Sequence, residues 1–165
     1  AYAGRADQGL KFPDGRPLRI PVRMAEVHGL IQHRGLEVRG LYVRTWIGHA
    51  DQLNLFKGLT GDEGVAEQIV GGYVEAAFNL FSLPALTARF PGVYLAPFVR
   101  WEVYDTHHRV PVGFERNPAL HRRVWTLGLT FKPIPAVVIK ADFQDRWNEA
   151  GTARNQWNLG IGFNF

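Results

Sequence analysis

The last ten residues of the chain, 156–165, alternate strictly between bulky apolar side chains and polar or very small ones. Successive residues of a β-strand point to opposite faces, so a period of two places each set on its own face. The apolar set consists of Trp157, Leu159, Ile161, Phe163 and Phe165. A bulky aromatic at a free carboxyl terminus is uncommon, because chain ends usually fray. We therefore predict a closing strand with one face suited to lipid and the other suited to water.

The composition excludes several other classes of protein. A chain of 165 residues can form one domain with its own core, and we treat residues 1–165 as a single region. No stretch approaches the roughly 20 consecutive apolar residues that a transmembrane helix needs, which excludes that class. The absence of cysteine excludes disulfide frameworks, zinc–cysteine sites and cysteine nucleophiles. The first residues lack the charged and apolar regions of a signal peptide, so we expect a mature or truncated chain.

Six further segments show the same alternation, and each is predicted to be a membrane-crossing strand with two faces of opposite polarity. They are residues 19–32, 36–47, 70–81, 93–105, 124–132 and 136–147. Segment 36–47 is the least regular, since Leu41 and Val43 fall opposite Val38 and Tyr42. A β-bulge in this strand, or a loop packed inside a barrel, would each explain the irregularity.

The connections between these segments differ in length in a regular way. Residues 48–67, 106–122 and 148–155 would form long loops on one side of the membrane, predicted to be extracellular. Residues 33–35 and 132–135 would form short periplasmic turns, the first closed by a glycine with a positive φ angle. Short turns on one side and long loops on the other are expected of such barrels. The longer periplasmic turn at 82–92 departs from this rule.

The number of predicted strands is odd. Single-chain bacterial barrels use even numbers of antiparallel strands, so seven strands would not close on themselves. Residues 18–165 hold these strands, and residues 1–17 are read as an outer loop or the remnant of a preceding strand. We expect either the carboxy-terminal part of a larger barrel or an unrecognised eighth strand within residues 1–17.

Several stretches of the chain resemble the carboxy-terminal part of Gram-negative outer-membrane porins related to the phosphate-selective group. They are residues 72–78, 95–105 and 126–143, together with the terminal strand. The resemblance covers about residues 18–165. It implies a barrel of about sixteen strands in the bacterial outer membrane, commonly a homotrimer, through which small hydrophilic solutes or ions diffuse passively. The implied partners are outer-membrane lipid, lipopolysaccharide and the barrel assembly machinery, which would recognise the aromatic end of the last strand. The residues that usually set selectivity would lie largely outside this chain.

The charged residues on the predicted water-facing side are the candidates for lining a pore. They are Glu26, His28, Arg39, Glu75, Arg100, Glu102, Lys140, Asp142 and Arg146. In a water-filled channel such charges set ion selectivity through the local potential. The alternative is that acids and bases pair across neighbouring strands and only brace the wall. The net charge of +4 slightly favours anions as solutes.

No other motif indicates catalysis, a metal or a cofactor. His107 and His108 follow Asp105, but neighbours on a strand point to opposite faces and cannot readily share one ion, so we predict a solvated loop there. No nucleophile elbow or phosphate-binding loop is present, and nothing indicates a nucleic acid as partner. Residues 50–56 can form a short helical turn in an outer loop, and the sequence leaves open whether this turn enters the pore.

Two other interpretations stay open. A complete eight-stranded barrel would act as a membrane anchor, an adhesin or a lipid-modifying enzyme, with an interior filled by side chains rather than water. A soluble β-barrel or sandwich that binds a ligand would instead bury the aromatic side chains as a core. The leading prediction is an all-β, antiparallel transmembrane barrel segment that acts as a porin and not as an enzyme.

Overall fold

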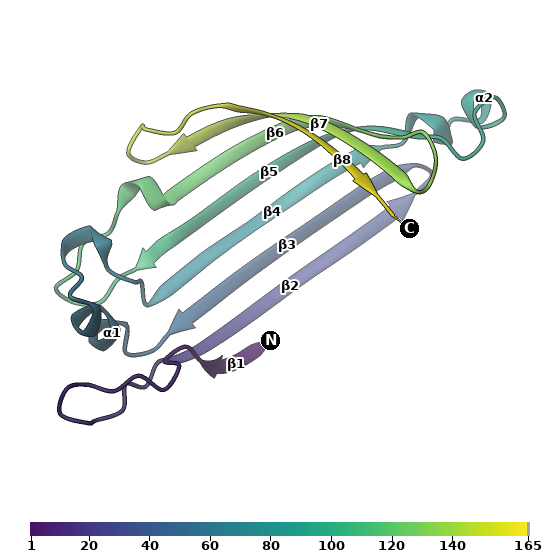
Figure 1. Ribbon diagram of the computed structural model, residues 1–165. Helices are drawn as coiled ribbons and strands as arrows, with labels where there is room; N and C mark the ends of the chain where they lie inside the picture. Colours follow the sequence, from purple (N-terminus) through teal and green to yellow (C-terminus); the bar gives the residue numbers. More distant parts are fainter. Residues whose placement is uncertain (165) are drawn as a thin grey trace.

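The structure, a computed structural model, describes residues 1–164 and contains a single antiparallel sheet of eight strands (Figure 1). The last residue, Phe165, lies outside the described residues, so its predicted place on the lipid-facing side is not covered. The strands are β1 (Tyr2–Arg5), β2 (Pro21–His33), β3 (Leu36–Ile47), β4 (Gln68–Phe78), β5 (Tyr94–Arg109), β6 (His121–Lys132), β7 (Val137–Asn148) and β8 (Gln156–Phe163).

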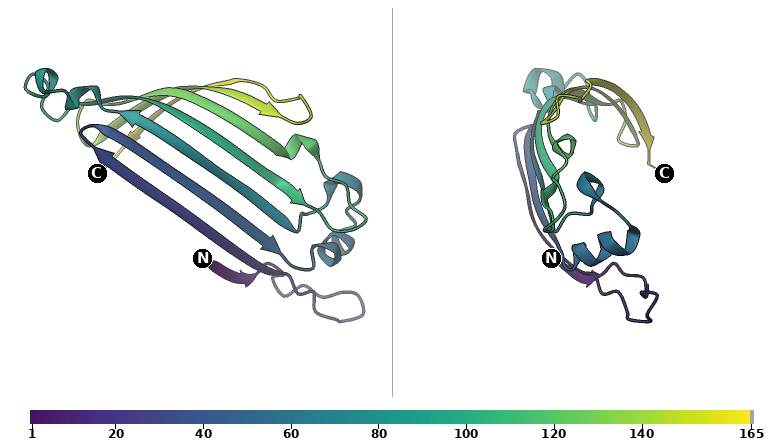
Figure 2. Two further views of the ribbon diagram at one scale, coloured as in Figure 1. Left: turned by 180° about the vertical axis from the view of Figure 1, so that it is seen from behind. Right: turned by 90° about the vertical axis from the view of Figure 1, so that its left-hand side faces the viewer.

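Each strand pairs with its neighbours in the chain, in the order β1 to β8. The seven predicted strands correspond to β2 through β8. The eighth strand, β1, lies within residues 1–17 but has only four residues and pairs with β2. Within the described residues β8 pairs only with β7, so the sheet is an open arc, as the end-on view in Figure 2 shows.

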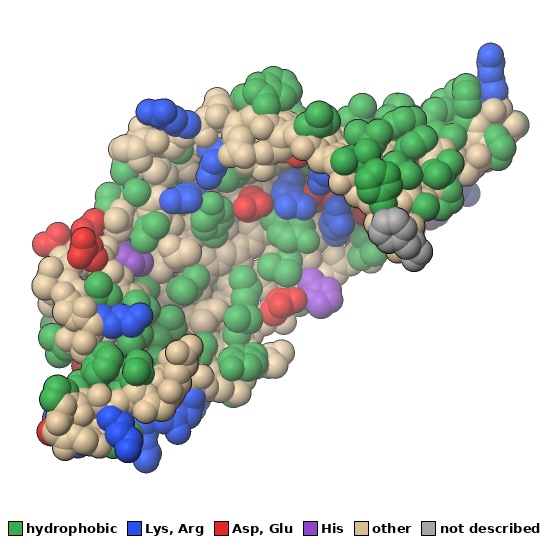
Figure 3. All heavy atoms as spheres, viewed as in Figure 1, with side chains coloured by type: hydrophobic (Ala, Val, Ile, Leu, Met, Phe, Trp, Pro, Cys, Tyr) green, Lys and Arg blue, Asp and Glu red, His purple; other side chains and the backbone are tan. Residues whose placement is uncertain are grey.

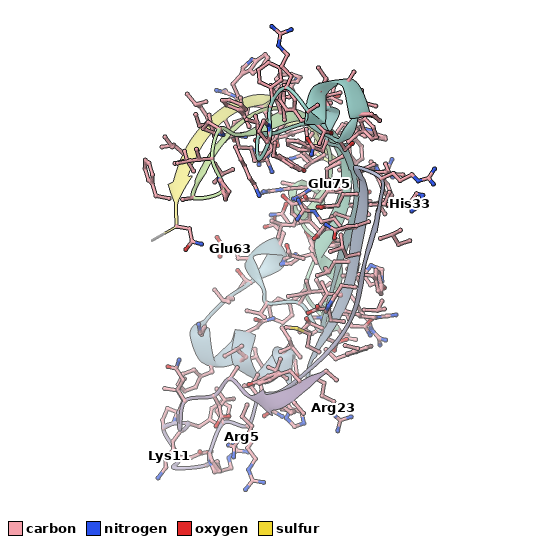
Figure 4. The ribbon with its side chains drawn as sticks, turned by 90° about the vertical axis from the view of Figure 1, so that its right-hand side faces the viewer. Arg5, Lys11, Arg23, His33, Glu63 and Glu75 are labelled. Carbon is pink, nitrogen blue, oxygen red and sulfur yellow. The ribbon has the colours of Figure 1, made fainter. Side chains whose placement is uncertain are left out.

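The pairing register assigns every strand residue to one of two faces, because residues directly opposite each other point to the same side of a sheet. Arg39 pairs with Glu75, and Glu75 pairs with Arg100, so these three share a face. Figure 4 shows Glu75 on the concave side of the arc, whereas Arg23 and His33 project from the convex side. Polar and charged side chains line most of the concave face, and apolar side chains cover most of the convex face.

The two ends of the sheet carry different connections (Figure 1). One end, called here the long-loop end, holds residues 6–20, 48–67, 110–120 and 149–155. Its helical segments are α1 (Ala50–Lys57), η1 (Gly61–Glu63) and η3 (Pro118–Leu120). The opposite end, the short-turn end, holds residues 34–35 and 133–136 and the longer connection 79–93, with its segments η2 (Leu80–Ser82) and α2 (Pro84–Thr87). Long loops and short turns therefore lie at opposite ends of the sheet, as predicted, and the connection 79–93 is the predicted exception.

Three of the predicted boundaries are wrong by three residues or more. β4 ends at Phe78 instead of residue 81, because the chain turns into η2. β5 continues to Arg109 and β6 begins at His121, so the loop between them is shorter than the predicted 106–122. The β2–β3 turn has the predicted form, since Gly35 has φ of 89° and Arg34 has φ of 47°. No helix within residues 1–164 is long and apolar enough to cross a membrane.

A small apolar core lies on the concave side at the long-loop end. Leu18, Ile20 and Leu53 are buried there, and Ile47 of β3 packs against them. In Figure 2 helix α1 lies inside the arc. The β2–β3 register runs without a bulge from Val22 to His33. The irregular alternation of 36–47 is therefore not caused by a bulge: Leu41, Val43 and Ile47 all face the concave side, and Ile47 packs against the apolar core there.

Candidate functional site

The register places all nine predicted pore-lining residues on the concave face of the sheet. Figure 3, which looks into this face, shows acidic and basic side chains gathered in the hollow. They do not form one ring. Arg39, Glu75, Arg100 and Glu102 are brought together, whereas His28 contacts Glu26 at 2.8 Å in a separate pair on β2.

Glu75 is the centre of a cluster that joins three neighbouring strands. Its side chain is almost fully buried, with 2% of the residue exposed. The Nε atom of Arg39 donates to one carboxylate oxygen at 2.8 Å, and the Nε atom of Arg100 donates to the other at 2.8 Å. Glu37 lies 4.0 Å from Arg39, and Glu102 lies 3.7 Å from Arg100. Here acids and bases pair across strands, as expected if these charges brace the wall of the sheet instead of lining a pore.

The three candidates on β7 lie in a different environment. Lys140 is placed over the ring of Phe98, 4.3 Å from its centroid, and makes no ion pair with any described residue. Arg146 donates to the side chain of Gln156 at 3.0 Å and also lacks an acidic partner within residues 1–164. Asp142 accepts from Asn158 at 2.7 Å. The β7 side of the concave face therefore presents two cations without an ion-pair partner among residues 1–164, and the carboxylate of Asp142 lies between them on the same strand.

Two concave-face cations were missed by the sequence interpretation. The prediction places Arg122 in a loop and Lys132 at the junction of a strand and a turn, but both belong to β6 and point to the concave side. The even-numbered parity of this strand continues through both positions and would have identified them.

Helix α1 narrows the concave space at the long-loop end (Figure 2). The fully buried side chain of Asn54 on this helix holds the following loop: its amide donates to the carbonyl oxygen of Val65 at 3.0 Å, and its oxygen accepts from the Val65 amide at 2.7 Å. The predicted helical turn is therefore present, and it lies inside the arc.

Replacing Asn54 with alanine should free the loop from 58 to 67, because the N–H and C=O groups of Val65 would lose their partners. The expected local loss of stability is about 2 kcal/mol, the typical range for orphaned buried backbone groups. Hydrogen exchange at the Val65 amide measures it directly. Gln52→Ala, at an exposed position of the same helix, should leave that exchange rate unchanged.

The loops at the long-loop end are joined by a second charged cluster. Arg116 contacts the carboxylate of Asp105 at 2.8 Å and that of Glu149 at 3.0 Å, and His121 contacts Glu149 at 3.2 Å. His107, predicted to lie in a solvated loop, is instead a buried residue of β5, because this strand continues past Asp105. Its Nδ1 accepts from the backbone N–H of Asn117.

Acidification should loosen the contact between the two loops. The hydrogen bond from His121, together with Arg116, lowers the pKa of Glu149 below its usual value. A carboxylate with a lowered pKa contributes stability above its unfolded pKa, and this contribution is lost as pH falls through the folded pKa. Proteolysis of residues 149–155 should therefore accelerate as the pH falls below about 4.5. Glu149→Gln should remove this pH dependence, and a variant that retained it would contradict the assignment.

The convex face exposes an unusual amount of large apolar surface. The predicted lipid-facing residues of β8 show this most clearly, with Trp157 79%, Leu159 81%, Ile161 64% and Phe163 62% exposed. The strand register places all five tryptophans of the chain on this face: Trp46, Trp101, Trp125, Trp147 and Trp157. A curved sheet that encloses an apolar core carries its apolar side chains on the concave face. Here the concave face is polar and the convex face is apolar, which is the reverse arrangement.

Comparison with known proteins adds one relative. The chain is 26% identical over 140 residues to an uncharacterised protein of Aquifex aeolicus (strain VF5). The match covers 82% of this chain and 31% of that protein, so the chain spans less than a third of the length of the relative it matches. No family model matches the chain, and no solved structure matches it. The resemblance to porins therefore stays a prediction.

Proposed function

We propose that this chain forms part of the wall of an outer-membrane porin, with its convex face in lipid and its concave face toward a water-filled pore. The observation that carries the proposal is the exposed apolar convex face. Monomeric soluble proteins rarely expose contiguous apolar patches larger than a few hundred Å². Contact with lipid instead makes such a surface favourable, because only every second residue of a barrel strand meets the bilayer.

The open arc favours closure by further strands. The carboxyl edge of the sheet, β8, has one partner within the described residues, and backbone groups at an edge are not tolerated in the hydrocarbon of a membrane. The greater length of the Aquifex aeolicus relative is consistent with a barrel that contains more strands. We therefore favour a part of a larger barrel, as a homotrimer in the bacterial outer membrane, over a complete small barrel.

The solutes proposed for this pore are small and hydrophilic, with a preference for anions. The two arginines of the Glu75 cluster are matched by the three carboxylates of Glu37, Glu75 and Glu102, so a positive potential on this part of the wall depends on cations without an ion-pair partner, above all Lys140 and Arg146. Unpaired charge on a pore wall changes the local concentration of mobile ions. Passive diffusion needs no catalytic group and no cofactor.

Conductance of the full-length protein in planar lipid bilayers tests the proposal. Insertion should give stepwise increases in current, and the reversal potential in a salt gradient should indicate anion preference. The double substitution Lys140→Glu and Arg146→Glu should shift that potential toward cations. Arg34→Glu/Arg89→Glu, in the connections at the short-turn end, is the control with the same change of net charge and should not shift it. A membrane-inserted protein that passes no current would refute the proposal.

A further inference from the structure

The two ends of the convex face differ in charge. At the short-turn end the strand residues on this face include Leu36, Phe78, Phe131 and Phe163, and none of the described strand residues there is Lys, Arg, Asp or Glu. Toward the long-loop end the register places five arginines on the same face. Arg5 and Arg109 pair with Asp7 and Glu67, whereas Arg23, Arg44 and Arg123 form no ion pair with any described residue. The membrane-facing side of the sheet is thus apolar at one end and cationic at the other.

A groove of about 660 Å³ lies between Arg44 and Arg123. Its floor lies at Gly71 and Gly72, and its walls include Tyr42, Val74 and Trp101. Gly72 has no side chain to fill the space between Tyr42 and Val103, its register partners on the two flanking strands. A Cβ atom at Gly72 would approach the carbonyl oxygen of Leu41 to 2.7 Å, so the close strand packing here requires glycine.

Arg44 and Arg123 flank the groove from opposite sides. Arg44 on β3 pairs with Val70, and Arg123 on β6 pairs with Val103, and both of these valines line the groove. The two arginines stand three strands apart, roughly 14 Å at the usual strand spacing. Arg123 stacks on Trp147 with 4.8 Å between the guanidinium carbon and the ring centroid.

The hydrogen bonds of Arg44 are incomplete. Its Nη2 atom donates to the side chain of Gln68, and its guanidinium lies over the ring of Trp46 at 5.5 Å. Its Nε atom is buried. Among the buried side-chain nitrogen and oxygen atoms of residues 1–164, this one has no hydrogen-bond partner. An unsatisfied buried donor is costly, so the Arg44 side chain would be stabilised by moving this atom to an acceptor at the surface.

The acidic groups near the groove leave this positive charge in place. Asp105, which lines the groove toward the long-loop end, is already paired with Arg116 at 2.8 Å. Asp145 of β7 is exposed on the same face and forms no ion pair with any described residue. The flanking arginines therefore have a net positive charge beside a long apolar groove.

We infer that this groove binds an acyl chain of a membrane lipid whose anionic phosphate headgroup is held by Arg44 and Arg123. The inference rests on the proposed function, since it requires the convex face to lie in a bilayer. The planar guanidinium matches phosphate oxygens with paired hydrogen bonds. Tryptophans such as Trp46 and Trp147 favour the depth of the headgroups, which places both arginines where phosphates lie. The groove then extends from that depth toward the hydrocarbon.

Native mass spectrometry of the full-length protein in detergent tests this inference. The protein is mixed with equal amounts of phosphatidylglycerol and phosphatidylcholine that carry identical acyl chains. Phosphatidylcholine has its own ammonium group beside the phosphate and competes poorly for arginine. Retention of phosphatidylglycerol should exceed that of phosphatidylcholine by about tenfold, the ratio expected for one additional charge-assisted hydrogen bond. The double variant Arg44→Gln/Arg123→Gln should reduce this ratio to near one.

Matched variants distinguish lipid binding in the groove from a general effect of the protein's charge. Arg23→Gln/Arg34→Gln removes the same net charge away from the groove and should keep the selectivity. Val74→Trp fills the groove and should reduce the number of lipids retained, whereas Val99→Trp, on the same face outside the groove, should not.

Three results would overturn the inference. Equal retention of both lipids by a protein that conducts in bilayers would leave the porin proposal intact and refute the lipid site. Loss of the trimer in Val74→Trp with unchanged lipid retention would assign the groove to a second copy of the chain. Failure of the unmodified protein to insert into any membrane would refute both proposals together.

Discussion

Replacing Glu75 with alanine should lower the free energy of unfolding by about 3 kcal/mol, the lower part of the range for breaking a buried ion pair. The carboxylate separates the guanidinium groups of Arg39 and Arg100 and accepts hydrogen bonds from both. Its removal leaves two cations on flanking strands without their shared partner. We choose the lower value because water reaches both arginine side chains, which are 41% and 28% exposed. Urea unfolding of the full-length protein in lipid vesicles, followed by tryptophan emission, measures the change.

Glu102 provides the matched control. It contacts Arg100 at 3.7 Å from a partly exposed position, so Glu102→Gln should cost about 0–1 kcal/mol. If Glu75→Ala cost no more than this control, the three-strand cluster would behave as an ordinary exposed ion pair. The bracing role that we assign to Glu75 would then be wrong.

Placing arginine at Leu127 should cost about 2–4 kcal/mol in a membrane, because the convex face would force a charge into hydrocarbon. Leu127 is 59% exposed and lies in the middle of β6, where Val99 and Phe143 are its register partners. At an exposed position of a soluble protein the same substitution would change stability by less than about 0.5 kcal/mol. Unfolding of the full-length protein in vesicles distinguishes these two results.

Gln144→Arg is the control for this effect. Gln144 follows Phe143 on β7 and points to the concave face, where Thr126 and Gln156 are its register partners. An arginine there would face water, so the stability should change little. Equal costs for Leu127→Arg and Gln144→Arg would show that the two faces do not meet different solvents.

The strands β2 to β8 could be predicted because each alternates over eight residues or more. A long strand with one apolar face leaves a period of two that no helix reproduces. The same alternation of side chains predicted that Lys140 and Arg100 lie on one face, before it was known which strands pair with each other. It failed for β1, whose four residues, from Tyr2 to Arg5, are too few to show a period. That strand forms because it pairs with the long strand β2.

The grouping of the charged residues could not be read from the sequence. Glu75 meets Arg39 and Arg100 only through the register of three strands, and the register depends on turns and pairing beyond any single strand. The continuation of β5 past Asp105 was also hidden, because His107 and His108 are polar residues that usually indicate a loop. Here the carboxylate of Asp105 accepts a hydrogen bond from the His107 backbone N–H at 2.9 Å and forms an ion pair with Arg116. These contacts supply partners for the polar groups at the end of the strand.

The groove on the convex face depends on both kinds of information. Gly71 and Gly72 are visible in the sequence as an adjacent pair within a strand, where glycine often marks a close approach of backbones. Their position between Arg44 and Arg123 appears only when four strands are aligned.

Spin labelling of β8 tests the central claim, that the convex face lies in lipid and the concave face in water. The chain contains no cysteine, so single cysteines at positions 157 to 161 can each carry a nitroxide in the full-length protein in vesicles. Positions 157, 159 and 161 should be accessible to oxygen, which concentrates in hydrocarbon, and positions 158 and 160 to a water-soluble nickel reagent. Equal access of the nickel reagent to all five positions would contradict the claim.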